Sequence, residues 1–372
     1  MLIRNSAART SPGSRTAPAF SSSEIRRAVQ AIRGWRAYEP TPLLTRADLA
    51  RELGVADVWY KDESKRLGLG SFKALGGAYA VERSLARQAR RRRPTFVCAT
   101  DGNHGRAVAW AADRHGCAAT VFVPRAITAP RIAAIREYGA RVHVVDGTYD
   151  DAARLARTVA EAEEWQLISD AGETVTERST WDVMYGYQII GHEILEQLPR
   201  HVAITHMFVQ AGVGGLAASL VRFRQGRRPA PVMITVEPEA ADCVFQSIAA
   251  RRRVRVPGAL RTIMSGLACA RPSAPAWSVL RHRVDFAMRI PDRFARDAMR
   301  LAASFPGSQR LVVGESGAAG LAGCLALVRS GRTSDVRLSS ESQVLFVGTE
   351  GATDPARYRL ITGHEPNMEA RA

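Results

Sequence analysis

Short apolar runs alternate with amphipathic stretches along most of this chain of 372 residues. Most runs are followed by a stretch whose apolar positions recur every three or four residues, as on one face of a helix. We expect strands at 57–61, 95–99, 119–124, 140–145, 165–169, 206–211, 232–238 and 343–348. We expect helices at 103–114, 129–138, 149–164, 181–198, 214–223 and 317–328. This alternation predicts an α/β fold with parallel sheets and helices on both faces.

The expected strands between 95 and 169 form a compact group, which predicts two sheets in two domains. The boundaries that we expect are 24–85 together with 189–372 for a large domain, 86–188 for a smaller inserted α/β domain, and 1–23 for a flexible tail. The tail is rich in Ser, Ala and Arg and has no apolar segment of the kind found in secretory signals. No apolar run reaches the length of a membrane span. We therefore expect a cytoplasmic protein without a membrane partner.

The amino-acid composition is that of an ordinary globular enzyme, with 46% apolar and 24% charged residues. The net charge of +16 raises the question of a nucleic-acid partner. The arginines, however, are spread over the chain, and the densest runs, at 87–94 and 251–255, have no aromatic residues between them. We expect a solvated basic surface and no nucleic-acid site.

The five cysteines form no C-x-x-C pair, so we expect neither a metal site nor a secreted disulfide scaffold. Cys98 and Cys324 stand in apolar stretches that are typical of a core. Cys243 and Cys269 fall in segments that resemble loops. A disulfide between these last two therefore stays open.

The chain has only three lysines, Lys61, Lys65 and Lys73, and every other Lys or Arg position is Arg. In such a chain a lysine is expected where Arg cannot serve. A guanidinium stays protonated, whereas a desolvated lysine amine can lose its proton, attack a carbonyl and form a Schiff base. Lys73, in SFKALGG at the start of an expected helix, is the candidate for this chemistry. We expect the positive end of the helix dipole to favour its neutral amine.

The segment ATDGNHGRAVAWAA follows the expected strand at 95–99. Asp101 stands where the strand ends, a position suited to general acid or base chemistry. Asn103 offers an amide donor at the start of a helix, and Gly102 permits a tight turn beside it. His104 by itself is more typical of a packed core residue.

A glycine loop, QAGVGG, follows another expected strand. Gly212, Gly214 and Gly215 let successive backbone amides point at an anion in front of the next helix. The loop is neither a Walker loop nor a complete dinucleotide fingerprint. A Schiff-base lysine together with an anion-binding loop points to pyridoxal 5′-phosphate, an aldehyde that carries a phosphate. Ser316 and Thr349 add neutral hydroxyls that can meet its pyridine nitrogen.

These segments stand in the same order as the motifs of fold-type II pyridoxal-phosphate enzymes, the group of threonine dehydratase and the tryptophan synthase β-subunit. Within this group the chain resembles the diaminopropionate ammonia-lyase family from about Tyr38 to Asp354. The shared motifs are YEPTPL, KDES followed by SFKALGG, ATDGNHGRAVAWAA, QAGVGG, VEPEAADC, TIMSGLAC, GESGA and TEGATD. The resemblance implies two parallel-sheet domains, a pyridoxal-phosphate cofactor and a homodimer.

The resemblance also implies roles for the candidate residues at the cofactor. Lys73 would form the Schiff base, and Asn103 would donate a hydrogen bond to the phenolic oxygen. Thr349 would lie beside the pyridine nitrogen and, as a neutral partner, leave it unprotonated, which suits elimination over transamination. The phosphate would be bound by the amides of Gly212, Val213, Gly214 and Gly215.

Two aspartates would be the bases that act on the substrate. Asp101 matches the family residue that removes the Cα proton of D-substrates, and Asp170, in LISDAG, matches the one that acts on L-substrates. The implied reaction is α,β-elimination of the amino acid 2,3-diaminopropionate to pyruvate and ammonia.

Three segments depart from the family pattern. After the second aspartate the family has a Trp-Glu-Gly-Tyr stretch, whereas this chain has AGETVTERST; GLG and ACARP replace GLN and ACGEP. These differences keep β-replacement and the dehydration of serine or threonine open as alternatives. A catalytically silent basic protein of the same fold is a further alternative, and the clustering of every lysine around Lys73 argues against it.

Overall fold

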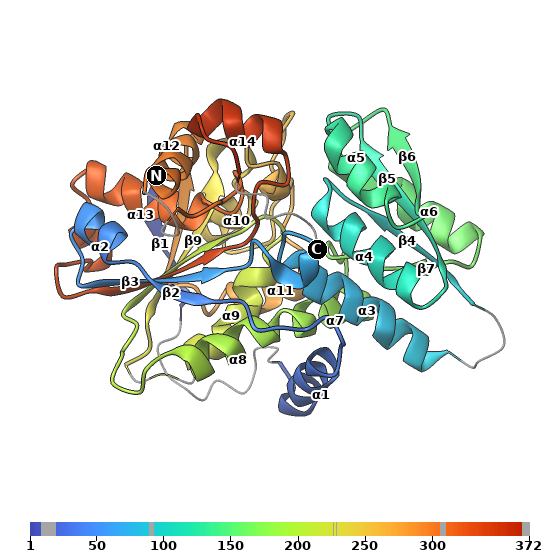
Figure 1. The fold of residues 1–372 in the computed structure, drawn as a ribbon, viewed down its shortest axis with the longest axis horizontal. Coiled ribbons are helices and arrows are strands. Elements are labelled where there is room, and N and C mark those ends of the chain that lie inside the picture. Colours follow the sequence, from blue (N-terminus) through green and yellow to red (C-terminus); the bar gives the residue numbers. More distant parts are fainter. Residues whose placement is uncertain (9–19, 89–92, 226, 228, 306–309, 367–372) are drawn as a thin grey trace.

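The computed structural model describes residues 1–8, 20–88, 93–225, 227, 229–305 and 310–366. Two sheets stand side by side, each with helices on both faces, and the segment that forms the smaller sheet is inserted into the chain of the larger one (Figure 1). The expected α/β fold with parallel sheets is confirmed. The division into domains at the boundaries given above stays a prediction.

The larger sheet contains seven strands in the order β1-β10-β9-β8-β11-β3-β2. Only the edge strands β1 and β2 run antiparallel to their neighbours. The strands are β1 (Leu2–Arg4), β2 (Leu43–Thr45), β3 (Asp57–Asp62), β8 (His206–Gln210), β9 (Val232–Pro238), β10 (Phe286–Ile290) and β11 (Gln343–Gly348). The central strands β8 and β11 are buried on both faces, which explains their nearly continuous apolar sequences.

Helices cover both faces of this sheet, and in Figure 1 α12 to α14 lie above it while α8 and α9 lie below. One face packs against α2 (Ala47–Leu53), α12 (Asp292–Ala303), α13 (Ala319–Arg329) and α14 (Pro355–Thr362). The other packs against α1 (Ser22–Arg33), α7 (Arg178–Gly186), α8 (Gln188–Gln197), α9 (Gly215–Gln225), α10 (Cys243–Ala250) and α11 (Ala274–Leu280). The two apolar cores on these faces hold the sheet rigidly between them.

The smaller sheet contains four parallel strands in the order β6-β5-β4-β7. They are β4 (Thr95–Ala99), β5 (Ala118–Pro124), β6 (Arg141–Val145) and β7 (Gln166–Leu167). Alternate residues of β4 point to opposite faces: Phe96 and Cys98 join the core under α4 (Asn103–Arg114) and α5 (Ala129–Arg136), whereas Val97 and Ala99 pack against α6 (Tyr149–Ala162).

Helix α3 (Lys73–Arg87) connects the two sheets, because it packs against α4 on one side and α7 on the other. Its glycines permit the close approach. A Cβ on Gly77 would lie 2.7 Å from the Cβ of Ala107, and a Cβ on Gly76 would lie 2.5 Å from the Tyr187 ring. The ALGG sequence after Lys73 therefore reflects tight helix packing.

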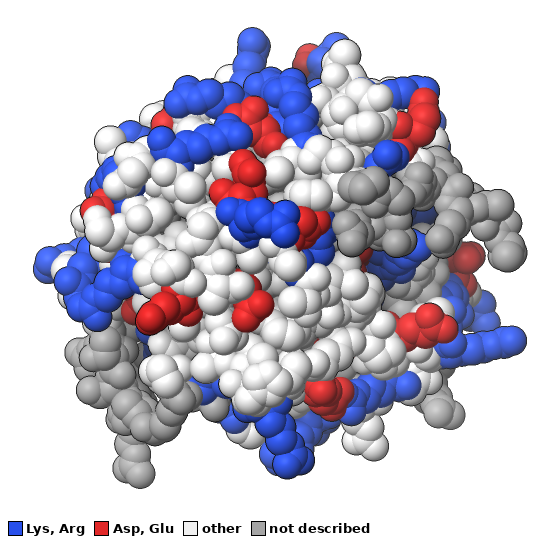
Figure 2. Space-filling model, turned by 60° about the vertical axis from the view of Figure 1, so that its left-hand side comes forward, with Lys and Arg blue, Asp and Glu red and all other residues white. Residues whose placement is uncertain are grey.

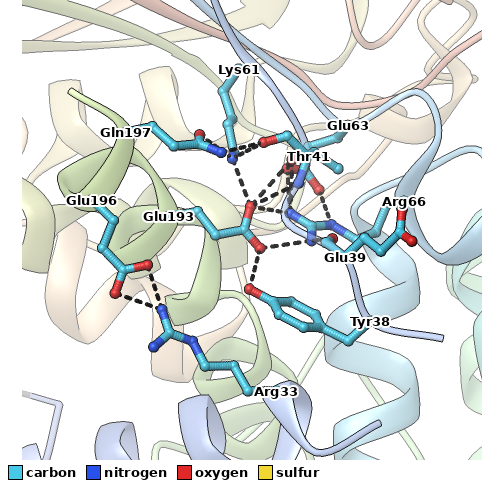
Figure 3. Close-up of polar contacts among 10 residues, drawn as sticks. All are labelled: Arg33, Tyr38, Glu39, Thr41, Lys61, Glu63, Arg66, Glu193, Glu196 and Gln197. Atoms are coloured by element: carbon cyan, nitrogen blue, oxygen red, sulfur yellow. Dashed lines mark hydrogen bonds and ion pairs between the residues drawn. The ribbon is translucent and has the colours of Figure 1, made fainter. Parts of the chain in front are cut away.

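A buried ion network fixes the chain that leads into α3 (Figure 3). Glu193 on α8 pairs with Lys61 on β3 at 2.6 Å and with Arg66 at 2.7 Å. Arg66 also pairs with Glu63 at 2.8 Å. All four side chains are buried, and two cations balance two carboxylates. The network thus anchors the irregular segment between β3 and α3 without leaving a net charge inside.

The same network explains why residue 61 is a lysine. Its ammonium donates to the carboxylate of Glu193, to the backbone carbonyl of Thr41 at 2.6 Å and to the side-chain oxygen of Gln197 at 2.9 Å. Three acceptors around one nitrogen suit a compact ammonium better than a planar guanidinium. Lys61 therefore has a structural role, which leaves Lys73 as the lysine at the pocket described below.

Three details differ from the sequence-based expectations or lie beyond them. Residues 2–4, expected in a flexible tail, form strand β1, and the helix α1 begins at Ser22. The helix expected at 181–198 is divided into α7 and α8. Residues 9–19 of the expected tail, and 89–92 of the first arginine run, lie outside the described residues.

The surface carries basic side chains over much of the face shown in Figure 2, with acidic side chains between them. In the part of the chain that the structure describes, no helix is both long and apolar enough to cross a membrane. Nor does any group of His, Cys, Asp and Glu side chains among these residues have an arrangement that could hold a metal ion.

Candidate active site

A pocket of about 900 Å³ opens between the two sheets. Its wall is built by the segments that follow β4 and β7 of the smaller sheet and β8 and β11 of the larger one. Ligands of open α/β sheets bind at this edge, outside the carboxyl ends of the strands. The pocket is lined by all the residues singled out from the sequence: Lys73, Asp101, Asn103, Asp170, Gly212, Val213, Gly214, Gly215 and Thr349.

Lys73 is the first residue of α3, and its amine faces Asp170 from the other side of the pocket. The Lys73 Nζ donates a hydrogen bond to Asp170 Oδ2. The second carboxylate oxygen, Oδ1, accepts a bond of 3.0 Å from the hydroxyl of Tyr149, the first residue of α6. Both oxygens of Asp170 are thus engaged, which fixes the orientation of the carboxylate.

The Lys73–Asp170 pair sets the protonation of both groups. Burial by itself would lower the pKa of Lys73, but the adjacent Asp170 carboxylate outweighs it and holds this pKa well above its usual value. Burial would likewise raise the pKa of Asp170, but the charge of Lys73 holds it well below its usual range. The expectation that the helix dipole leaves the Lys73 amine neutral is therefore wrong, because a carboxylate in contact outweighs a helix end.

Asp101 stands in the loop after β4 and has the opposite tendency. Burial raises the pKa of Asp101 to about 7, although the cations of Arg131 and Lys73 oppose the shift. A carboxyl group that titrates near neutral pH can both accept and donate a proton. One pocket therefore presents two aspartates, one held ionised and one near its midpoint.

The glycine loop forms an anion cradle at the start of α9. Gly212 to Gly215 lie between β8 and the first turn of that helix, where backbone N–H groups have no partners within the helix. A side chain would fill the cradle: a Cβ on Gly212 would lie 3.1 Å from the Cys269 Sγ, and Gly214 has a φ of +92° that favours glycine. The loop can therefore bind a phosphate through amides.

The hydroxyl of Thr349 is oriented by a neighbour that the sequence did not indicate. Gln210 Nε2 donates to Thr349 Oγ1 at 2.9 Å and to the backbone carbonyl of Val347 at 2.9 Å. Because the Thr349 oxygen accepts this bond, its own proton is free to be donated. A hydroxyl in that state suits an unprotonated pyridine nitrogen.

Asn103 lines the pocket as the first residue of α4. Its Nδ2 donates to Glu350 Oε2, and the other oxygen of Glu350 accepts from the backbone amide of Ser316 at 3.1 Å. The Ser316 hydroxyl in turn accepts from the amide of Gly266 at 3.0 Å. A cofactor oxygen that accepts a hydrogen bond from the Asn103 side-chain amide would thus share this donor with the Glu350 carboxylate.

Cys243 and Cys269, between which the sequence left a disulfide open, are both free thiols. Cys243 donates through its Sγ to the carbonyl of Gly212 at 3.4 Å, and Cys269 lies beside the same glycine. Burial raises the pKa of both thiols well above the usual value. Both thiols are thus protonated; Cys243 packs against the glycine loop, and Cys269 lines the pocket.

Five pocket residues were missed by reasoning from the sequence: Arg131, Tyr149, Tyr187, Gln210 and Glu350. Gln210 and Glu350 lie within the recognised motifs QAGVGG and TEGATD, and that membership was the available signal. Arg131 and Tyr149 lie on helices and Tyr187 lies between α7 and α8, all away from any glycine motif, and only the fold brings them to the pocket.

The donor set fits pyridoxal phosphate. A lysine amine, an amide cradle, a hydroxyl ready to donate and an amide donor match its aldehyde, phosphate, ring nitrogen and phenolic oxygen. The Tyr187 hydroxyl and the Gln210 Oε1 are buried polar atoms that have no hydrogen-bond partner among the described residues. Both face the pocket as lining residues, which is consistent with a polar ligand there.

Comparison with known proteins gives an independent view of the same site. The chain is 37% identical over 371 residues to the diaminopropionate ammonia-lyase of Escherichia coli K12, covering 93% of each chain. The crystal structure of diaminopropionate ammonia lyase from Escherichia coli in complex with an aminoacrylate-PLP azomethine reaction intermediate matches with a TM-score of 0.89 at 33% identity, covering 97% of this chain and 96% of that one.

The apo form of the same Escherichia coli enzyme matches with a TM-score of 0.82 at 30% identity, covering 97% of this chain and 95% of that one. The family described as "Pyridoxal-phosphate dependent enzyme" matches residues 35–349, a span that holds every candidate residue of the pocket. On these findings, together with a pocket that fits the cofactor, the chain belongs to the family of pyridoxal-phosphate dependent enzymes.

Proposed function

We propose that this enzyme catalyses the α,β-elimination of 2,3-diaminopropionate, which with water yields pyruvate and two molecules of ammonia. The observation that carries the proposal is the pair of aspartates beside Lys73: Asp170 is held ionised, while Asp101 titrates near neutral pH. Similarity to diaminopropionate ammonia-lyase over 93% of the chain supports the choice of substrate.

When bound, pyridoxal phosphate supplies an aldehyde for the substrate amine and a ring that accepts the electron pair left at Cα. Lys73 would provide the amine that holds the cofactor, the glycine loop would bind its phosphate, and Thr349 would donate to its ring nitrogen. The Thr349 hydroxyl carries no charge, so it would leave this nitrogen unprotonated. A cofactor held by these residues would lie between the two sheets, in the pocket that both aspartates line.

The two aspartates remove the Cα proton of opposite enantiomers, Asp101 that of the D-form and Asp170 that of the L-form. Asp170 is ionised at all ordinary pH values because Lys73 stabilises its charge. Asp101 becomes a base as the pH rises through about 7.

The test is pyruvate release from each enantiomer by the wild type and three variants. Lys73→Ala should abolish turnover and the absorbance band of the Schiff base between the lysine and the cofactor. Asp101→Asn should lower kcat for the D-form by at least about 100-fold and leave the L-form active, and Asp170→Asn should do the reverse. Equal losses on both enantiomers would overturn the division of labour, and an active Lys73→Ala with an unchanged spectrum would overturn the lysine assignment.

A second candidate is dehydration or β-replacement on the same cofactor. It is favoured by the loop that departs from the family pattern, since Glu173 of that loop pairs with Arg253 and, at 3.3 Å, with Arg271 of the altered ACARP segment. Incubation with serine, threonine and added thiol or amine nucleophiles separates the cases. Product from these substrates without pyruvate from 2,3-diaminopropionate would replace the first proposal by the second.

We also propose that the enzyme acts as a cytoplasmic homodimer. The support for a dimer is the resemblance to the ammonia-lyase family. Light scattering of the purified protein should give twice the chain mass, and a monomer mass at working concentrations would contradict the proposal.

A further inference from the structure

A buried arginine crosses the active-site pocket. Arg131 lies on α5 beside the smaller sheet, and only 7% of its surface is exposed. Its Nη1 donates to the backbone carbonyl of Asp101 at 3.3 Å and to the hydroxyl of Ser265, and its Nη2 donates to Thr353 Oγ1 at 3.4 Å. Ser265 precedes the pocket residue Gly266, and Thr353 lies in the segment after β11 of the larger sheet, so one guanidinium joins the Asp101 loop to the chain around the larger sheet.

The loop that carries Asp101 rests on the stem of this side chain. A Cβ on Gly102 would lie 3.1 Å from the Cδ of Arg131, and Gly102 has a φ of +140°. The absence of a side chain at this residue lets the loop lie directly on the arginine. The Asp101 backbone is thus held by two contacts: the next residue packs on the Arg131 stem, and the guanidinium donates to the Asp101 carbonyl.

The charge of Arg131 is only weakly compensated. Its hydrogen-bond acceptors are neutral oxygens, and the carboxylate paired with it, Glu315, is 4.0 Å away. Burial and the neighbouring Glu350 raise the pKa of Glu315 to about 7, so this carboxyl is partly protonated at neutral pH. The Arg131 Nε has no hydrogen-bond partner among the described residues. The positive charge of Arg131 therefore stabilises negative charge nearby, including that of the Asp101 carboxylate.

The charged groups that face Asp101 come from four elements. Arg131 on α5 and Lys73 on α3 favour its carboxylate, in that order, whereas Asp170 after β7 and Asp150 on α6 oppose it. Lys73 is already paired with Asp170. Arg131 is thus the cation whose removal would change the pKa of Asp101 most.

We propose that Arg131 is a positioning residue for Asp101, holding its backbone against the wall of the larger sheet while its charge favours the ionised carboxylate. The proposal rests on the proposed function, in which Asp101 is the base for the D-enantiomer. It predicts that the loss of Arg131 harms one enantiomer more than the other.

The experiment compares three variants by the pH dependence of kcat/KM on D- and L-2,3-diaminopropionate. Arg131→Met keeps the stem and removes the charge, and Arg131→Lys keeps the charge. Arg106→Met is the matched control, because Arg106 on α4 also donates to a carbonyl of the larger part, Leu69 at 3.0 Å, but does not line the pocket. Arg131→Met should move the acid limb of kcat/KM for the D-form up by about one pH unit, which lowers this kcat/KM at pH 7 about fivefold. In Arg131→Met the acid limb for the L-form should keep its position. Arg131→Lys should return the acid limb for the D-form to near its wild-type pH. Arg106→Met should leave the acid limbs for both enantiomers where they are in the wild type.

A second readout needs no turnover. Hydrogen exchange of the backbone amides at 100–105, followed by mass spectrometry, should speed up in Arg131→Met and not in Arg106→Met. Unchanged exchange together with an unmoved D-form limb would overturn the proposal. A rise in KM for both enantiomers with unmoved limbs would also overturn it and would indicate that Arg131 binds the substrate carboxylate. If the wild type processes neither enantiomer, the proposed function fails, and the exchange measurement alone then decides whether Arg131 holds the loop.

Discussion

Asp101 and Asp170 show how one side-chain type acquires two protonation states inside a single pocket. Asp170 touches the Lys73 ammonium and accepts a second bond from Tyr149, so its charge is stabilised. Among the described residues the Asp101 carboxylate has no such hydrogen bond or ion pair, and burial is the largest influence on its pKa. The difference in environment is what allows two aspartates to serve two enantiomers.

The first prediction concerns pH. Asp101 must be ionised to accept a proton, and its pKa is about 7, so activity on D-2,3-diaminopropionate should fall as the pH drops through about 7. Asp170 has a pKa well below its usual range, so activity on the L-form should show no acid limb from this group down to pH 5. The measurement is kcat/KM for each enantiomer between pH 5 and pH 9. Coinciding acid limbs would show that one group titrates for both substrates.

A second prediction at this scale concerns stability. The pKa of Asp101 is raised from 3.8 to about 7 on folding, so the ionised side chain costs free energy of folding above pH 7. As the pH falls below 7 the folded protein takes up this proton and the cost shrinks. Asp101→Asn should therefore raise Tm in the cofactor-free protein at pH 8, and the gain should be smaller at pH 5. A gain that grows toward acid would mean that the sign of the pKa shift is wrong.

At the scale of elements, helix α8 carries two glutamates in contrasting environments (Figure 3). Glu193 balances the buried cations of Lys61 and Arg66, and Glu196 pairs with Arg33 at the surface. Glu193→Ala should lower the free energy of unfolding by about 3–5 kcal/mol, because it leaves buried charge without a partner. Glu196→Ala, the control on the same helix, should change it by less than about 1 kcal/mol. Urea denaturation measures both, and similar losses for the two variants would contradict the role given to the network.

Elements with a strong pattern could be predicted from the sequence, and weakly patterned ones could not. Strands β9 and β11 match the expected ranges residue for residue, since both are buried apolar runs bounded by turns. The edge strands β1 and β2 have three residues each, which is too short for a periodic signal. Their existence depends on partners far away in the chain.

Some residues of the site could likewise be predicted from the sequence, and others could not. Lys73, Asn103 and the glycine loop could be predicted from the sequence, because each lies within a short motif whose residues indicate its chemistry. The bond from Tyr149 to Asp170, and the contacts of Arg131 with Ser265 and Thr353, join residues on separate elements. No local pattern encodes them, and the fold is needed to find them.

At the scale of the whole molecule, the pocket exists only where the two sheets meet. Lys73, the glycine loop and Thr349 belong to the chain around the larger sheet, whereas Asn103 and both aspartates follow strands of the smaller one. Residues from both sheets thus line the same pocket.

It follows that cofactor binding should stabilise both sheets together. At about 100 times its Kd, pyridoxal phosphate should add about 2.7 kcal/mol to the free energy of unfolding by mass action, and a covalent link to Lys73 should add to this. The loaded enzyme should unfold in one calorimetric transition, because its ligand contacts both sheets. Lys73→Ala keeps the phosphate cradle and Asn103, so it should show a smaller rise in Tm with added cofactor than the wild type, though not none. A wild-type protein whose Tm does not respond to pyridoxal phosphate would contradict a binding site shared by the two sheets, whereas two separate transitions in the loaded state would show that only one sheet holds the ligand.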